Sequence, residues 1–146
     1  NTDADIIIGQ EYGTEFNVPG YLYRTDQYEI VALNSKTEMI NQQKLTTVGN
    51  GNSFFADIKF KGKIIRVINA YLNPFSFEKA KVKPTEDLET NKKKALYILK
   101  RLIPTFKIHQ QEVSDIRKAI DDSPYPVILA GDFNSVPNSY EYYTLG

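Results

Sequence analysis

Two short, continuous apolar runs constrain the fold of this chain more than any other feature. One lies in DIII at residues 5–8, near the start of the sequence, and the other is VILA at residues 127–130, near its end. Unbroken apolar runs are typical of strands that are covered on both faces, as in the layers of α/β proteins. We therefore expect both segments to be buried strands.

Three further stretches have strand patterns. Residues 28–33 form a third candidate strand. Residues 54–60 alternate, with apolar side chains on one face and charged side chains on the other, which predicts a half-buried strand. Residues 61–63, Lys-Gly-Lys, predict a tight turn because glycine tolerates positive φ. Residues 64–72 then return as the partner strand of a hairpin.

From Thr85 onward the apolar period changes to that of a helix. Thr85 is a candidate cap, and acidic residues follow it in the first turn. Apolar residues then recur at helical spacing, at Leu88, Ala95, Leu99 and Leu102. Pro104 predicts a break or kink, so a second helical stretch is expected at about 106–121. These elements together predict an α/β or α+β fold, a mixed β-sheet with flanking helices.

The composition is that of one globular domain. The chain has 146 residues, which can bury a core. Its 18 basic and 18 acidic residues balance, which argues against a basic footprint over the whole surface but leaves room for a local basic groove. No cysteine is present, so disulfides and thiolate metal sites are excluded. No apolar run approaches the roughly 20 residues that cross a bilayer.

Polar side chains follow three of the expected strands. They are Gln10 and Glu11 after the first run, residues 69–73 at the end of the hairpin, and Asp132 with Asn134 after the last run. Binding sites in α/β sheets gather at the carboxyl ends of strands. If these strands lie side by side, we expect their polar ends to converge on one pocket.

The residues at these ends offer oxygen donors. Glu11, Asp132 and Asn134 are accompanied by no histidine or cysteine, and hard oxygen ligands suit Mg²⁺, Mn²⁺ or Ca²⁺ but not Zn²⁺. Mg²⁺ takes only one or two carboxylates and completes its shell with water and phosphate oxygens. A sparse acidic site therefore points to phosphate chemistry. There a carboxylate can activate water, and an amide can stabilise the charge that develops on the phosphate.

Each of these residues also has a plain structural interpretation. Asp132 and Asn134 are typical turn residues, and Glu11 is typical of an ordinary surface carboxylate. Tyr71 on an apolar strand is typical of a core aromatic residue whose hydroxyl is satisfied. His109, the only histidine, is predicted to be a surface or packing residue on a helix.

Four segments together resemble the endonuclease/exonuclease/phosphatase superfamily, which includes DNase I-like nucleases, AP endonucleases, sphingomyelinases and inositol-polyphosphate phosphatases. ADIIIGQE at residues 4–11 is similar to its D-I-hydrophobic-Q-E segment, and ALNSKTEMINQ at 32–42 to its S-K-containing segment. VINAYLNP at 67–74 is similar to a strand that usually reads N-x-H-L. SPYPVILAGDFNSVPNSYEYYTL at 123–145 is the closest match, because GDFN at a strand end is highly specific for this superfamily.

The resemblance covers nearly the whole chain and implies one half of the four-layer DNase I-like β-sandwich. In that fold two mixed sheets pack face to face, with helices outside. It also implies cleavage of a phosphoester by an activated water, with Mg²⁺ as the metal and Mn²⁺ as an alternative. Residues 1–146 are accordingly expected to be a partial domain of this kind.

The resemblance implies roles for those residues of this chain that match the superfamily's motifs. Glu11 resembles the metal-binding glutamate, and Asp132 resembles the aspartate that orients the attacking water. Asn134 resembles the amide that contacts the scissile phosphate. Tyr71 stands where most branches have histidine and where AP endonucleases have tyrosine, so its hydroxyl is expected to reach a phosphate oxygen. Asn69 is placed with Tyr71 and Asn134 among the substrate-binding residues.

Two features of the superfamily are missing from this sequence. One is an asparagine on an earlier strand, and the other is an Asp-His pair near the C-terminus. His109 cannot replace that histidine, because it precedes GDFN on a helix. We therefore expect an N-terminal portion that lacks the first strand and the C-terminal half and has little or no activity alone. We also expect the opposing sheet to be missing, which would expose an apolar sheet face and favour self-association.

The leading hypothesis is a metal-dependent phosphodiesterase or phosphatase. The alternative is a degenerate or truncated member that acts as a binding or interaction module, and a third reading is a structural domain with capping acids. Nucleic acid, inositol phosphate and lipid headgroups all remain candidate substrates. The lysines at 92–94 are predicted to form a solvated helix face, with a phosphate-binding patch as the alternative. The sequence does not indicate localisation.

Overall fold

The computed structural model describes residues 3–11, 17–26, 28, 30–45, 52–73 and 88–133, with the backbone alone at residues 101 and 105. Asn134 and the expected helix cap Thr85 lie outside these ranges. The elements in chain order are β1 (Ile6–Gly9), β2 (Tyr23–Arg24), β3 (Ala32–Ser35), β4 (Met39–Lys44), β5 (Phe54–Phe60), β6 (Lys63–Tyr71), α1 (Leu88–Asp121) and β7 (Val127–Asp132).

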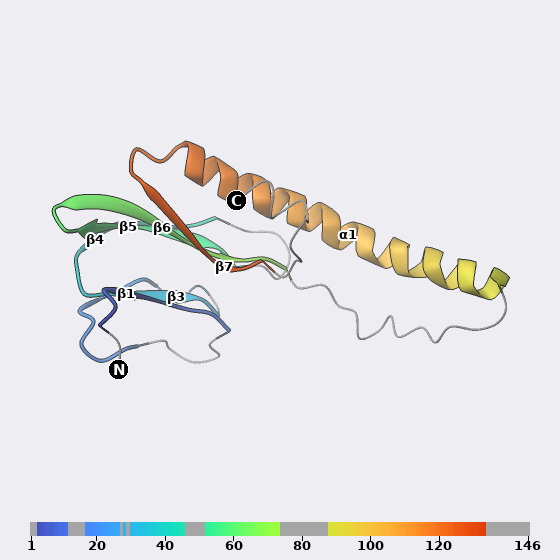
Figure 1. Cartoon of the computed structure of the whole chain (residues 1–146), viewed down its shortest axis with the longest axis horizontal. Coiled ribbons are helices and arrows are strands. Elements are labelled where there is room, and N and C mark those ends of the chain that lie inside the picture. Colours follow the sequence, from blue (N-terminus) through green and yellow to red (C-terminus); the bar gives the residue numbers. More distant parts are fainter. Residues whose placement is uncertain are drawn as a thin grey trace.

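The described strands form two sheets, and helix α1 lies on the outer side of the larger one (Figure 1). The smaller sheet has the order β1-β3-β2 and is antiparallel. The larger sheet has the order β4-β5-β6-β7, in which only the β6–β7 pair is parallel. The prediction of an α+β fold with a mixed sheet is therefore confirmed.

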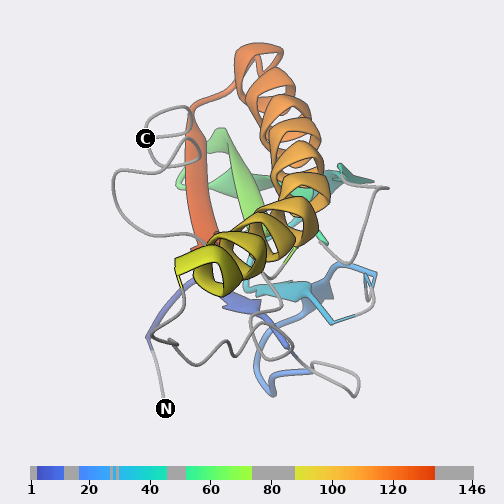
Figure 2. The same cartoon turned by 90° about the vertical axis from the view of Figure 1, so that its right-hand side faces the viewer.

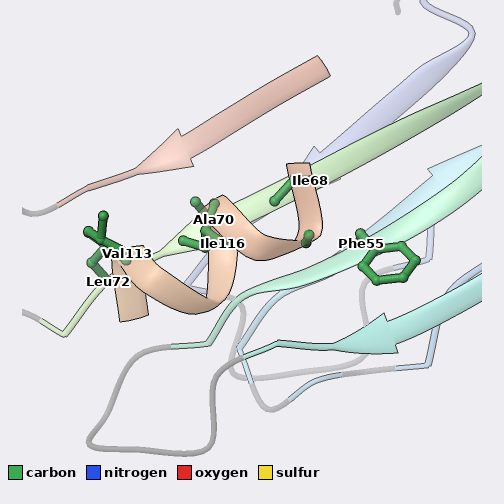
Figure 3. Close-up of a cluster of buried hydrophobic side chains, with 7 residues drawn as sticks. Phe55, Ile68, Ala70, Leu72, Val113 and Ile116 are labelled. Atoms are coloured by element: carbon green, nitrogen blue, oxygen red, sulfur yellow. The ribbon is translucent and has the colours of Figure 1, made fainter. Parts of the chain in front are cut away.

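One apolar cluster joins the larger sheet to the C-terminal half of α1. Ile68, Ala70 and Leu72, in and directly after β6, pack with Val113 and Ile116 of the helix (Figure 3). All five residues are fully buried. Burial of a large aliphatic side chain contributes about 1.5–3 kcal/mol, so this cluster anchors the helix on the sheet.

A second apolar cluster joins the two sheets. Phe54 of β5 and Val67 of β6 pack with Leu33 of the smaller sheet, and all three are buried. On the other face of β5, Phe55 belongs to the helix-facing cluster and Asp57 is also buried. The prediction that residues 54–60 are half-buried is therefore wrong, because α1 covers the face that was expected to be solvated.

The expectation that the opposing sheet would be missing is also wrong. Strands β1, β2 and β3 supply that sheet from within this chain, and the second cluster is buried between the two sheets. Part of the same face is exposed on β7, where Ile128 is the register partner of Val67 and is 51% exposed. Self-association through this part of the face stays a prediction.

The hairpin prediction is confirmed at the level of individual residues. Phe60 pairs with Lys63, so Lys61 and Gly62 form a two-residue turn between β5 and β6. Their φ angles are 50° and 79°. Two consecutive positive φ values are the pattern of the type I′ turn, whose twist matches that of the strands it joins.

Other element predictions need correction. The candidate strand at 28–33 is instead a bridge between Tyr28 and Val31, followed by β3 from Ala32. Strand β4 was not predicted, because its core sequence Asn-Gln-Gln-Lys lacks apolar alternation. It is held in the sheet by antiparallel backbone pairing with β5, and its residues are partly or fully exposed.

Of the break or kink predicted at Pro104, helix α1 has a kink, so the two helical stretches expected on either side of the proline form one helix. It runs unbroken through Pro104 from Leu88 to Asp121. Figure 2 shows that its yellow N-terminal part and its orange C-terminal part point in different directions, and a proline inside a helix explains such a bend. The expected apolar face is not buried, since Leu88 is 67% and Leu99 is 53% exposed. No described helix combines the length and apolar character needed to cross a membrane.

A charged pair is buried between the larger sheet and α1. Arg66 Nε lies 2.8 Å from Asp57 Oδ1, and Arg66 Nη2 donates to Asp57 Oδ2 at 3.1 Å. The third nitrogen, Nη1, donates to the Ala119 carbonyl oxygen of the helix at 3.0 Å. The guanidinium carbon also lies 3.8 Å from the centre of the Phe55 ring. Arg66 thus ties β5, β6 and α1 together.

Gly131 lies where β6 and β7 approach too closely for a side chain. Its register partner is Ala70, and a Cβ placed on Gly131 would lie 1.9 Å from the Ala70 carbonyl oxygen. We expect Gly131→Ala to lower the free energy of unfolding by about 1–3 kcal/mol, because the strands must separate. Urea denaturation followed by circular dichroism measures this change. Gly62→Ala has open space around it but also a positive φ of 79°, so this control gives the cost of backbone strain without a steric clash. A loss in Gly131→Ala that is no larger than the loss in Gly62→Ala would contradict the steric explanation.

Candidate functional site

Glu11 and Tyr71, which were predicted from separate motifs, meet in the structure. The Tyr71 hydroxyl donates a hydrogen bond to Glu11 Oε1 at 2.8 Å. Glu11 follows β1 of the smaller sheet and Tyr71 ends β6 of the larger sheet, so the contact bridges the two sheets. Tyr71 is buried and Glu11 is exposed, which places the carboxylate at the rim of the core. The core and the site interpretations of Tyr71 are therefore compatible.

The backbone of Glu11 has an uncommon conformation. Its φ is 56°, in the left-handed region that residues other than glycine seldom adopt. Such a conformation costs on the order of 1–3 kcal/mol and persists only where the surroundings enforce it. Strained residues of this kind cluster at functional sites, so the conformation supports a specific role for Glu11.

Two amide side chains lie beside this contact. Gln10 Nε2 donates to Asn69 Oδ1 at 2.7 Å and to the Ala70 carbonyl oxygen at 3.2 Å. Asn69 Nδ2 in turn donates to the Gly9 carbonyl oxygen at 3.4 Å. Asn69 is fully buried, so these hydrogen bonds join the ends of β1 and β6. Its expected role in substrate binding stays a prediction.

Asp132 ends β7 directly beside Tyr71. The two residues are register partners, and the Leu72 N–H donates to the Asp132 carbonyl oxygen at 3.1 Å. Phe133 packs against the helix-facing cluster, so strand alternation places Asp132 on the side of Tyr71. The structure therefore brings Glu11, Tyr71 and Asp132 to neighbouring strand ends, whereas Asn134 lies outside the described residues.

The donors at these strand ends fit a hard divalent cation. The carboxylates of Glu11 and Asp132 are both exposed, and Mg²⁺ or Mn²⁺ takes one or two such ligands with water and phosphate oxygens. Within the ranges that the structure describes, no group of three or more His, Asp or Glu side chains forms a metal site. The two carboxylates therefore suit only a metal ion that takes few ligands from the protein.

Two buried side chains of α1 hold the backbone that follows Tyr71. The backbone N–H of Asn73 donates a hydrogen bond to the Glu112 carboxylate, with its nitrogen 3.0 Å from Oε2 and 3.2 Å from Oε1. The Asn73 carbonyl oxygen accepts a hydrogen bond from His109 Nε2, which therefore carries the proton. The packing interpretation of His109 is confirmed and the surface one is wrong, since only 1% of it is exposed.

This role of Glu112 was not predicted from the sequence. The available signal was its position three residues after His109, beside the apolar Val113 and Ile116. Side chains that are three residues apart lie on the same side of a helix, so His109 and Glu112 share the side of α1 that Val113 and Ile116 bury. A carboxylate on a buried helix face needs a donor, and the Asn73 N–H supplies one.

No protein-family model matches the chain, and no curated protein matches it by sequence. Solved structures do match it. Beta toxin from Staphylococcus aureus superposes with a TM-score of 0.64 and 16% identity, over 98% of this chain and 57% of the toxin chain. A humanized TDP2 from D. rerio superposes with a TM-score of 0.58 and 13% identity, over 97% of this chain and 53% of that chain.

A third match is sphingomyelinase C from Streptomyces griseocarneus, with a TM-score of 0.50 and 14% identity over 83% of this chain and 39% of that chain. Other structures of the first two proteins contain bound magnesium ions in beta toxin and a single-strand DNA product in TDP2. The chain spans little more than half the length of beta toxin and TDP2. Over the part that it spans, this chain therefore has the DNase I-like fold of beta toxin and TDP2.

Proposed function

We propose that this chain is part of a metal-dependent phosphoester hydrolase, a phosphodiesterase or phosphatase that uses a metal-activated water. The observation that carries the proposal is the meeting of Glu11, Tyr71 and Asp132 at the ends of β1, β6 and β7. The bound magnesium of beta toxin and the DNA product of TDP2 support this kind of chemistry in proteins of the same fold.

Glu11 is the proposed ligand of Mg²⁺ or Mn²⁺. Glu11 would hold the metal, which when bound would supply polarisation of the phosphoryl oxygen and stabilisation of the leaving oxygen. The Tyr71 hydroxyl donates a hydrogen bond to Glu11 Oε1, so its first effect is to hold the carboxylate in one orientation. This proposes a positioning role for Tyr71. The contact with a phosphate oxygen that the sequence predicts would use the same proton, so the hydroxyl can donate to only one of the two partners at a time. Because its ring is packed in the core, the hydroxyl is held in place at little further entropic cost.

Asp132 is proposed to orient or deprotonate the attacking water. Asn134 is proposed to donate its amide to the scissile phosphate, where negative charge increases as the bond breaks. Asn69 is proposed to support substrate binding by Tyr71, since its hydrogen bonds with Gln10 and Gly9 keep the ends of β1 and β6 together. The substrate remains a phosphate ester of a nucleic acid, an inositol phosphate or a lipid headgroup.

The activity is proposed for the complete protein that contains this chain. Residues 1–146 are proposed to be an N-terminal portion of the domain, and they span 57% of the beta toxin chain and 53% of the TDP2 chain. The 146-residue chain alone is expected to have little or no activity. A complete protein that binds metal and phosphate esters without hydrolysing them would instead favour the alternative, a binding module.

Metal binding by the chain tests the site without an activity assay. We expect the chain to bind Mn²⁺, measured by the electron paramagnetic resonance signal of the free ion, and Glu11→Gln to weaken binding by about 100-fold or more. Tyr71→Phe is expected to weaken it by about 10-fold, because partners that orient a metal ligand contribute 10- to 100-fold. Glu38→Gln removes an exposed carboxylate elsewhere and is the matched control. Equal Mn²⁺ affinity in the Glu11 and Glu38 variants would refute the assignment.

A further inference from the structure

The N-terminal half of α1 extends beyond both sheets (Figure 1) and carries an exposed apolar stripe. The stripe consists of Leu96, Leu99, Ile103 and Phe106, which are 57%, 53%, 47% and 48% exposed. Their spacing of three, four and three residues places them along one side of the helix. Single exposed apolar residues are ordinary, but a continuous row of four large ones marks a contact surface.

The same half of the helix is strongly basic. Residues 88–108 contain five lysines and one arginine against one glutamate, although the whole chain has balanced charge. Lys93, Lys100 and Lys107 are exposed and recur every seven residues, so they form a lysine row along the helix. Lys100 and Lys107 follow Leu96 and Ile103 by four residues, which places the lysine row directly beside the apolar stripe.

The helix that presents these features is preformed. Its C-terminal half is anchored on the larger sheet by Val113 and Ile116, and hydrogen bonds from His109 and to Glu112 hold it to the end of β6. A short isolated helix would have to fold when it binds a partner, whereas α1 is already folded before binding. The stripe and the lysine row are therefore displayed in a fixed arrangement.

We propose that the N-terminal half of α1 binds the surface of a membrane that contains anionic phospholipids. An apolar stripe flanked by lysines is the pattern of a helix that lies in the membrane interface. There the apolar side chains enter between the lipid headgroups, and the lysines are attracted to the negative surface. A nucleic acid would pair with the lysine row but would leave the leucine and isoleucine side chains in water, so the two features together favour lipid.

Vesicle co-sedimentation of the 146-residue chain tests this proposal. Vesicles of phosphatidylcholine mixed with an equal part of phosphatidylserine are compared with phosphatidylcholine alone, in EDTA so that metal-dependent hydrolysis plays no part. We expect the chain to partition at least about 10-fold more strongly onto the anionic vesicles. This preference should fall as salt is raised, because salt screens surface charge.

Two double variants separate the contributions. Leu99→Gln with Phe106→Gln, and Lys93→Gln with Lys100→Gln, are each expected to lower partitioning onto anionic vesicles by about 10- to 30-fold. Leu22→Gln, at a residue that is 84% exposed beside the smaller sheet, is the matched apolar control. Lys61→Gln with Lys63→Gln, at two exposed lysines in the β5–β6 turn and at the start of β6, is the matched charge control. Both controls should bind as the unaltered chain does.

Three results would overturn the proposal. The first is equal partitioning onto both kinds of vesicle, or no partitioning onto either. The second is binding to a DNA duplex that only the lysine double variant weakens, without vesicle binding, which would assign the surface to nucleic acid. The third is dimerisation in light scattering that Leu99→Gln with Phe106→Gln abolishes, without vesicle binding, which would assign it to a second copy of the chain.

Discussion

Replacing Asp57 with alanine is expected to lower the free energy of unfolding of this chain by about 3–5 kcal/mol. Asp57 and Arg66 form a two-fold hydrogen-bonded ion pair whose side chains are only 3% and 9% exposed. Removing the carboxylate leaves the guanidinium buried without its counter-charge, which is more costly than the loss of the contact itself. Chemical denaturation followed by circular dichroism gives the difference directly.

An exposed ion pair provides the matched control. Lys59 and Glu38 are separated by the same 2.8 Å, but both side chains are 54% exposed. Glu38→Ala is expected to change stability little, because water already solvates both charges. The double variant Asp57→Leu with Arg66→Met should recover most of the lost stability, since apolar side chains of similar volume can replace a buried pair. Similar losses in Asp57→Ala and Glu38→Ala would show that burial does not set the strength of the pair.

Replacing Asp132 with asparagine in the complete protein is expected to reduce kcat/KM for a phosphodiester by about 10²–10⁴-fold. Asparagine has the shape of aspartate but cannot take a proton from the attacking water. The measurement is Mg²⁺-dependent hydrolysis of a generic phosphodiester, with circular dichroism to verify the fold. The effect should appear mainly in kcat, because the proposed role of Asp132 is in the chemical step and not in substrate binding.

Asp121→Asn is the control for this experiment. Asp121 is an exposed carboxylate at the end of α1, where it pairs with Arg117 at 3.2 Å, away from the strand ends that form the site. We expect this variant to retain the activity of the unaltered protein. Equal activity of the Asp132 and Asp121 variants would remove Asp132 from the mechanism, whereas hydrolysis that is insensitive to chelators would contradict the proposed metal.

Strand and turn predictions succeeded where the pattern is local. The positions of β1, β5, β6 and β7 and the two-residue turn at Lys61 and Gly62 follow from short stretches of sequence. The full burial expected of the first and last apolar runs is wrong, because most residues of β1 are only partly buried and Ile128 of β7 is exposed. The requirement for glycine at 131 has a different origin. It comes from the approach of the Ala70 carbonyl, 61 residues earlier in the chain, and no local pattern reveals it.

Predictions that depended on what covers an element failed. The alternation of β5 is visible in the sequence, but its charged face is buried because Asp57 meets Arg66 beneath α1. The apolar spacing of the first half of α1 is equally clear, yet Leu99 is exposed because this half extends beyond the sheets (Figure 1). Periodicity shows which residues share a face and does not show which face another element will cover.

The sequence by itself determined the strand ends of this protein and the kind of donors that they carry. Residue order and type alone show that a glycine precedes Asp132 and that Gln10 and Glu11 follow an apolar run. Only the tertiary structure decided that the hydroxyl of Tyr71, 60 residues after Glu11, donates a hydrogen bond to that carboxylate. The reason is physical: this contact exists because two sheets pack face to face, and packing between sheets is set by the whole core and not by neighbouring residues.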